Sequence, residues 1–195
     1  MDRELWNERY RTPRLVWTAE PNRFLRELGE RLAPGRALDL ACGEGRNAIW
    51  LARQGWTITG VDFAQVGLEK ARRHAEEHDV AVEWIEADVR TWQAPSAAFD
   101  LVALLYLHLP ANELDPVLRA AATAVAPGGT LFLVGHDRVN IEEGVGGPQN
   151  PAVLYTPEEI VTSLDGLEVV RAERVTRDVE AGTAIDALVQ ARRGA

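Results

Sequence analysis

Hydrophobic residues in this chain alternate between short continuous runs and longer stretches with helical spacing. The continuous runs have the length of buried strands, and the stretches between them place apolar residues three and four positions apart. Strands are predicted over residues 36–41, 57–61, 80–85, 99–105 and 130–135, and helices over 46–54, 64–78 and 111–125. Repeated strand–helix alternation favours parallel strands joined by right-handed crossovers. The pattern therefore predicts an α/β fold.

The two ends of the chain depart from this alternation. Helices are predicted over residues 2–11 and 20–32, and a short helix is predicted from Pro157, after the capping residue Thr156. Residues 137–155 have no period and are rich in glycine and proline, which predicts a long loop. The last apolar segments, 167–175 and 183–191, leave no room for a crossover helix and should pair antiparallel. The fold class is therefore a Rossmann-like, seven-stranded, mostly parallel sheet with helices on both faces, an antiparallel C-terminal hairpin and an N-terminal helical extension.

Composition narrows the classes of protein and partner. The 195 residues are 46% hydrophobic and 26% charged, as in a soluble globular domain. A net charge of −9 without a local basic cluster disfavours nucleic acid as a partner. No apolar run has the length of a membrane span, and the charged N-terminus lacks the apolar core of a signal peptide. The single cysteine, Cys42, excludes an internal disulfide, so we expect a cytoplasmic protein; no metal site is expected.

A glycine turn between the first strand and its helix is the strongest candidate binding site. Gly43 and Gly45 allow the backbone to approach a ligand closely, and the following helix presents its N-terminus there. The spacing Gly43-x-Gly45-x-x-Ala48 also fits a dinucleotide-binding fingerprint. A pyrophosphate, however, would be repelled by Asp39 in the first strand, whereas a cationic ligand would be attracted.

Two further carboxylates follow the next strands and should reach the same edge of the sheet. Asp62 ends the second strand and can accept hydrogen bonds from a ribose diol, while Asp88 follows the third and can accept from an exocyclic amine. Together with Asp39, these residues suit a ligand that combines a positive charge, a ribose and a purine.

These residues carry a resemblance to a known family. Residues 39–45, Asp-Leu-Ala-Cys-Gly-Glu-Gly, resemble the D-x-G-x-G-x-G motif of class I S-adenosylmethionine-dependent methyltransferases. Residues 42–47 are most similar to the tellurite-resistance-type branch and its small-molecule relatives. The segments 61–63, 87–89 and 127–129 extend the resemblance, and Ala41 departs from it where the family often has glycine.

The resemblance implies S-adenosyl-L-methionine as cofactor and S-adenosyl-L-homocysteine as product. Gly43 and Gly45 would approach the methionine part, Asp39 would hold its ammonium group, and Asp62 would bind the ribose. The other cofactor contacts implied at this edge are Phe63, Asp88 and Val89 around the adenine, the Leu105 backbone at the ammonium, and Ala41, Cys42, Arg46 and Asn47 along the turn. Cys42 can also be read as a small buried residue, and Arg46 and Asn47 as the start of a helix. Replacing Asp62 by alanine is expected to weaken cofactor binding by about 1–3 kcal/mol with the fold intact.

Methyl transfer needs a general base only when the acceptor atom must lose a proton. His108 and His136 follow the fourth and fifth strands and are the candidate bases, while Tyr10 precedes the core and is a candidate for positioning the acceptor. The expected partner is a small-molecule methyl acceptor, and the protein is expected to be a monomer or homodimer. Two other functions stay open: an NAD(P)-dependent oxidoreductase, and a non-catalytic module that binds S-adenosylmethionine.

The expected organisation is a single methyltransferase domain over residues 1–195. It would comprise an N-terminal helical extension or lid (1–34), a cofactor-binding core (35–136), a substrate loop (137–156), and a helix with the C-terminal hairpin (157–195).

Overall fold

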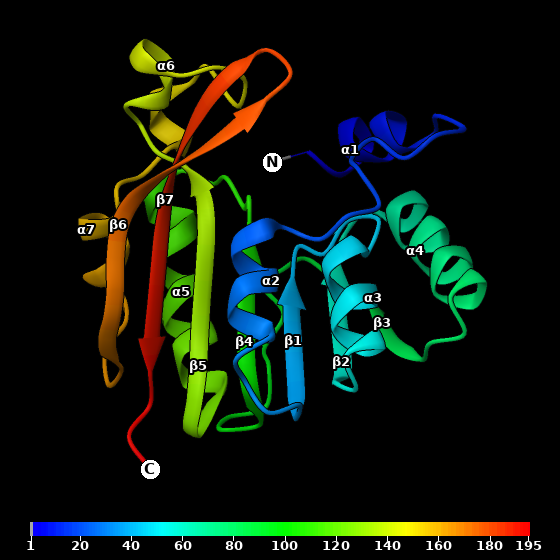
Figure 1. The fold of residues 1–195 in the computed structure, drawn as a ribbon, viewed down its shortest axis with the longest axis horizontal. Coiled ribbons are helices and arrows are strands. Elements are labelled where there is room, and N and C mark those ends of the chain that lie inside the picture. Colours follow the sequence, from blue (N-terminus) through cyan, green and yellow to red (C-terminus); the bar gives the residue numbers. More distant parts are fainter. Residues whose placement is uncertain (1) are drawn as a thin grey trace. The chain divides into compact units, whose positions relative to one another are not determined.

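The computed structural model describes residues 2–195, which form two compact units, one ending at Gln93 and one running from Ala94 to Ala195. The elements of the first unit are α1 (Arg3–Tyr10), α2 (Arg23–Gly29), β1 (Arg36–Leu40), α3 (Arg46–Arg53), β2 (Thr57–Asp62), α4 (Gln65–Glu77) and β3 (Val82–Glu86) (Figure 1). Strand β2 lies between β1 and β3, and both pairings are parallel. The carboxyl ends of these strands therefore meet at one edge.

Local sequence explains where the first unit's helices begin. Asp2 caps α1 by accepting from the backbone N–H of Glu4 at 2.8 Å, and Asn22 caps α2 by accepting from those of Phe24 and Leu25. The cap at Asn22 makes α2 begin three residues later than the predicted start at residue 20. Helix α3 begins directly after Gly45, whose left-handed backbone turns the chain from β1 into the helix.

The second unit contains β4 (Phe99–Leu105), α5 (Ala111–Ala124), β5 (Val125–His136), α6 (Asn140–Glu143), the 3₁₀ helix η1 (Pro151–Val153), α7 (Pro157–Val161), β6 (Glu168–Val179) and β7 (Gly182–Arg192). Strand β5 pairs with β4 in parallel and with β7 antiparallel, and β6 forms the edge beyond β7. In Figure 1 the β6–β7 turn and α6 lie at the same end of this unit. Helix α7 begins with the predicted cap at Thr156, completed by a reciprocal hydrogen bond from Glu159.

The predicted fold class is confirmed: the seven strands found in residues 2–195 are mostly parallel, and the last two form an antiparallel hairpin. Strand β5 begins five residues earlier than predicted because Val125 already pairs with Phe99 ahead of the Pro127–Gly129 turn. The predicted loop over residues 137–155 contains α6 and η1, which are too short to give a hydrophobic period. Among residues 2–195, no helix combines the length and apolarity needed to cross a bilayer.

Candidate functional site

The turn after β1 takes a left-handed backbone three times within five residues. The φ angles are 60° at Ala41, 56° at Gly43 and 78° at Gly45. Ala41 stands where the resembled motif often has glycine, and its positive φ shows why glycine suits that position, since a Cβ is disfavoured there. The alanine is accommodated, and both glycines of the turn are buried, with Tyr10 packed against Gly43 and Trp84 against Gly45.

Asp62 joins this turn to the end of β2. Its Oδ2 accepts from the backbone N–H of Gly43, and its Oδ1 accepts from that of Ala64, both at 2.8 Å. The residue is 5% exposed, and burial raises the pKa of its carboxyl group above the ordinary value. Each oxygen keeps a second lone pair, so the carboxylate can accept from a ligand while it shapes the turn.

Asp39 places a buried carboxyl group next to this turn. It is 1% exposed, and its Oδ2 has no hydrogen-bond partner among the described residues. Burial, and then the nearby charge of Asp62, raise the pKa of Asp39 to about 7, against smaller lowering effects from Arg46 and the Ala48 backbone. An unpartnered buried carboxylate oxygen fits a ligand that brings its own positive charge and hydrogen-bond donors.

Asp88 lies at the same edge as Asp62, because the backbone N–H of Ala87 donates to the Asp62 carbonyl at 3.0 Å. The Asp88 carboxylate binds Arg90, with Nη2 and Oδ2 2.6 Å apart, and this pairing holds the pKa of Asp88 below its usual range. Val89 and Phe63 flank these acids and are partly buried. The predicted adenine contacts are thus adjacent in space, with Asp88 already engaged by an arginine.

Other residues predicted along the turn have partners within the protein. Asn47 is buried, and its Oδ1 accepts from the backbone N–H of Asn22 at 2.8 Å, which anchors the start of α2. Arg46 donates to the Thr18 hydroxyl at 3.3 Å. Cys42 is buried, and burial followed by the charges of the two neighbouring aspartates raises the pKa of its thiol well above the ordinary value. A protonated, buried thiol is a packing residue and not a nucleophile.

The N-terminal extension packs over the turn. The Tyr10 side chain is 4% exposed, and a Cβ added at Gly43 would lie 2.7 Å from its hydroxyl oxygen. Burial, then the charge of Asp62, raise the pKa of this phenol well above its ordinary value. Tyr10 is therefore a neutral hydroxyl at physiological pH, which suits a positioning role and excludes action as a base.

Glu44, which was not predicted as a site residue, binds the segment that follows α1 to the glycine turn. Its carboxylate accepts from the backbone N–H of Val16 at 2.9 Å and from Lys70 Nζ at 2.8 Å. Lys70 Nζ also donates to the Arg14 carbonyl at 2.7 Å. Glu44 and Lys70 are both nearly fully buried, so this pair holds the extension to the turn. An acid inside a glycine turn gives no sequence signal that distinguishes this role from ligand binding.

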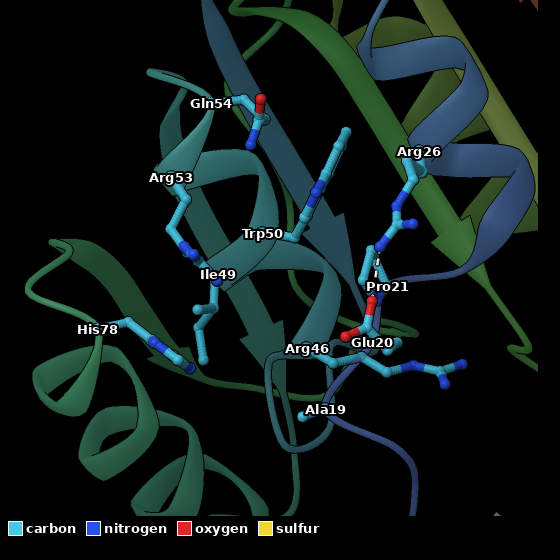
Figure 2. Close-up of a pocket in the computed structure, with 10 residues that line it drawn as sticks. All are labelled: Ala19, Glu20, Pro21, Arg26, Arg46, Ile49, Trp50, Arg53, Gln54 and His78. Carbon is cyan, nitrogen blue, oxygen red and sulfur yellow. Dashed lines mark hydrogen bonds and ion pairs between the residues drawn. The ribbon is translucent and has the colours of Figure 1, made fainter.

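A separate cavity of about 240 Å³ opens beside α3 (Figure 2). Figure 2 shows Trp50 and Ile49 of α3 with the ion-paired side chains of Arg26 and Glu20, whose Nη2 and Oε2 atoms are 2.6 Å apart. Asp39 and Asp62 do not line this cavity. The cavity is thus distinct from the carboxylate edge.

The second unit gathers both candidate histidines. His108 follows β4, His136 ends β5, and their rings stack with centroids 5.5 Å apart. Tyr106, a residue that the sequence analysis did not select, lies beside them with a positive φ of 59°, a strained conformation for a non-glycine residue. Leu105 is buried at the end of β4 and pairs with Val134 of β5.

Comparisons with known proteins agree with this architecture. Residues 37–129 match the protein family described as a methyltransferase domain. Over 114 residues the chain is 35% identical to the ubiquinone biosynthesis O-methyltransferase of Pectobacterium carotovorum, a match that covers 56% of this chain and 46% of that protein. The chain thus spans less than half the length of the curated relatives that it matches.

Two solved structures illustrate the shared fold. TehB from Haemophilus influenzae superposes with a TM-score of 0.74 at 15% identity, covering 98% of this chain and 66% of that one. Magnesium protoporphyrin IX methyltransferase from Synechocystis, determined with bound S-adenosylmethionine, gives 0.71 at 16% identity, covering 100% and 98%. At these identities the likeness establishes the fold alone. The chain thus contains a region similar to a methyltransferase domain, residues 37–129, within a fold that it shares with both solved structures.

Proposed function

We propose that this protein binds S-adenosylmethionine at the turn after β1 and transfers its methyl group to a small molecule. The observation that carries the proposal is the buried Oδ2 of Asp39, for which residues 2–195 provide no hydrogen-bond partner, next to the left-handed turn at Gly43 and Gly45. An ammonium group would supply the missing partner, whereas the pyrophosphate of a dinucleotide would bring a second negative charge to a carboxylate. The curated relatives, named as O-methyltransferases, support the same activity.

In this proposal Gly43 and Gly45 approach the methionine part, Asp39 pairs with the ammonium group, and Asp62 accepts from the ribose hydroxyls. The remaining cofactor contacts are proposed as predicted from the sequence: Phe63, Asp88 and Val89 at the adenine, and the Leu105 backbone at the ammonium. Asn47 bonds the backbone of Asn22, and Cys42 is a buried thiol, so we propose that both support the turn without contacting the cofactor.

Bound S-adenosylmethionine would supply a methyl group activated by a sulfonium. The task left to the chain is to orient the acceptor and exclude water, and positioning of this kind contributes roughly 7–11 kcal/mol in well-oriented reactions. Tyr10 and the second unit's histidines are the residues that we propose for contact with the acceptor. A small acceptor, a single domain and a cytoplasmic location remain predictions from the sequence.

Calorimetry separates the proposed cofactor from its rival. S-adenosylhomocysteine should bind the purified chain, and NADH should not bind at the same concentrations. Binding of NADH alone would favour the oxidoreductase. Turnover of S-adenosylmethionine with a panel of phenol, thiol, amine and metalloid acceptors then distinguishes an enzyme from a binding module, which would bind S-adenosylhomocysteine without transferring a methyl group to any acceptor.

The variant Asp62→Ala tests the proposed ribose contact. Affinity for S-adenosylhomocysteine should fall by about 1–3 kcal/mol, because hydrogen bonds to a charged acceptor are lost. The backbone donors of Gly43 and Ala64 also lose their acceptor, so the free energy of unfolding should fall by a further ~1–3 kcal/mol. The variant should still fold, as expected from the sequence, but with a lower free energy of unfolding.

Asp88→Ala is a control for stability alone, because its carboxylate mainly binds the part-buried side chain and backbone of Arg90, while Asp88 is itself a proposed adenine contact. It should leave the turn and the stability nearly unchanged. Calorimetry and urea unfolding of both variants measure the two effects. Unchanged affinity in folded Asp62→Ala protein would contradict the ribose role.

A further inference from the structure

Asp186 is a fully buried carboxylate on β7 that the proposed function does not use. Its Oδ2 accepts from the Tyr106 hydroxyl at 2.8 Å and from Arg177 Nε at 2.6 Å. Its Oδ1 faces His136 Nδ1 at 3.2 Å, because the antiparallel register places Asp186 directly opposite His136. One carboxylate thus contacts a tyrosine, an arginine and a histidine.

His136 Nδ1 and Asp186 Oδ1 are each the other's only possible hydrogen-bond partner among the described residues. Within residues 2–195, neither His136 Nδ1 nor Asp186 Oδ1 has another hydrogen-bond partner, and both atoms are buried. Their 3.2 Å separation is that of an ion pair not yet aligned as a hydrogen bond. Burial favours the neutral acid, but His136 and then Arg177 outweigh it and hold the pKa of Asp186 below its usual range. An ionised Asp186 requires a proton on His136 Nδ1, which leaves Nε2 as the acceptor nitrogen.

The two histidines differ in how their ring nitrogens are used. His108 Nδ1 lies 3.3 Å from the Val153 carbonyl, and its Nε2 faces the backbone N–H of His136 at 3.5 Å. Burial, then the neighbouring His136, lower the pKa of His108 to about 4, so it is neutral at physiological pH. For His136 Nε2, by contrast, the described part of the chain provides no hydrogen-bond partner. Of the two rings, only that of His136 has a nitrogen, Nε2, without a hydrogen-bond partner among residues 2–195.

The surroundings fix the His136 ring in place. An added Cβ at Gly147 would lie 2.6 Å from Cδ2 and 2.8 Å from Nε2 of the ring, so only a glycine leaves room beside Nε2. Asn140 anchors the residues before Gly147: its Nδ2 donates to the Gly146 carbonyl at 2.9 Å, and its Oδ1 accepts from Ile185 N–H at 2.7 Å. The ring is therefore held on one side by a loop and on the other by Asp186. Such fixation sets the orientation of Nε2.

We infer that Asp186 is a positioning residue that orients His136 as the general base for a hydroxyl acceptor, such as a phenol. This inference rests on the proposed methyltransferase function. The acceptor oxygen forms its bond to the methyl carbon as the carbon–sulfur bond breaks, with the bonding pair remaining on sulfur. The hydroxyl proton moves to His136 Nε2, and Asp186 stabilises the imidazolium that results. A thiolate or an anionic metalloid carries no such proton and would gain nothing from this pair.

The tautomer of His136 tests the inference without an acceptor. In full-length protein labelled with ¹⁵N-histidine, nitrogen shifts identify which ring nitrogen carries the proton, and His136→Gln assigns the signals among the four histidines. Above neutral pH the unmodified protein should show His136 protonated on Nδ1, and Asp186→Asn should redistribute the proton between the nitrogens. A ring protonated on Nε2 in the unmodified protein, or a tautomer unaffected in the variant, would overturn the inference.

Asp137→Asn is the matched control. Asp137 is equally buried, and its carboxylate pairs with Arg174 of β6, the strand that also carries Arg177, with Nε and Oδ2 2.9 Å apart. Among the described residues, Asp137 has no hydrogen bond or ion pair with either histidine ring. The variant Asp137→Asn measures how much stability is lost when a buried carboxylate is removed from an arginine of β6. The control should leave the His136 tautomer unchanged.

Activity provides a second readout. With catechol as the probe, Asp186→Asn should lower kcat by about 10–100-fold with little change in KM for S-adenosylmethionine, while methylation of thiophenol should hardly change. Equal losses with both probes would indicate a structural role and overturn the inference. Failure of S-adenosylhomocysteine to bind the unmodified protein would instead overturn the proposed function, and the tautomer measurement would still decide the role of Asp186.

Discussion

Replacing Asp39 by asparagine should stabilise the unliganded protein at pH 8 while weakening its affinity for S-adenosylhomocysteine. The folded protein keeps the Asp39 carboxyl protonated up to about pH 7, whereas the unfolded chain releases that proton near the ordinary pKa of 3.8. The folded state therefore binds more protons between these values, and its stability falls as the pH rises from about 4 to 7. At about 1.4 kcal/mol per pKa unit, the loss is on the order of 4 kcal/mol.

Urea unfolding at pH 5.5 and pH 8 measures this effect. The unmodified protein should lose stability between the two pH values, and Asp39→Asn should lose less, because asparagine cannot ionise. Its amide oxygen can still accept from the Ala48 backbone. Asp137→Asn provides the contrast, since that buried aspartate is paired with an arginine and its replacement should destabilise the protein at both pH values.

An ionised Asp39 should lower the stability of the unliganded protein but raise its affinity for S-adenosylhomocysteine. The proposed ammonium partner favours the ionised carboxylate, so binding of S-adenosylhomocysteine near pH 7 should release a proton. Calorimetry in buffers of different ionisation enthalpy detects that release. The variant Asp39→Asn should not release the proton and should bind S-adenosylhomocysteine at least about tenfold more weakly. If the stability of the unmodified protein and of Asp39→Asn depended on pH in the same way, and their affinities were equal, the proposed contact between Asp39 and an ammonium group would be wrong.

Topology explains how much of the carboxylate edge could be predicted from the sequence. Parallel strands bring their carboxyl ends to one edge, and Asp62 and Asp88 follow β2 and β3 directly, so their proximity follows from the strand order. The sequence could not show that Asp62 also holds the turn, or that Asp39 Oδ2 lacks a hydrogen-bond partner among residues 2–195, because both facts depend on side-chain packing. Likewise, no pattern indicated that Asn47 supports α2.

The residues around His136 were predicted only in part. Both histidines could be selected because they follow parallel strands, but Asp186 lies in an antiparallel strand where a polar residue is ordinarily expected to face solvent. Its contact with His136 depends on the register between β5 and β7, which a sequence without an evident turn signal does not specify. Tyr106 was missed for a related reason, because its positive φ, which directs the side chain, has no signature in a non-glycine residue.

Replacing Gly45 by alanine should cost far more stability than the same change at Gly128, although both glycines have nearly the same left-handed backbone. Their φ angles are 78° and 74°, so each substitution carries a conformational cost of about 1–2 kcal/mol. A Cβ at Gly45 would lie 2.5 Å from the Trp84 ring and 2.9 Å from Ala71 Cβ, whereas a Cβ at Gly128 would meet nothing within 4 Å.

Overpacking at Gly45 should add about 1–3 kcal/mol, so we expect losses of roughly 2–5 kcal/mol at Gly45 and about 1–2 kcal/mol at Gly128. Urea unfolding of the two variants measures the difference. Because Gly45 also begins α3, the Gly45 variant should lose affinity for S-adenosylhomocysteine even under conditions where it remains folded. Equal losses of stability at the two positions would mean that Trp84 moves aside freely, and the turn would then not depend on the absence of a side chain at Gly45.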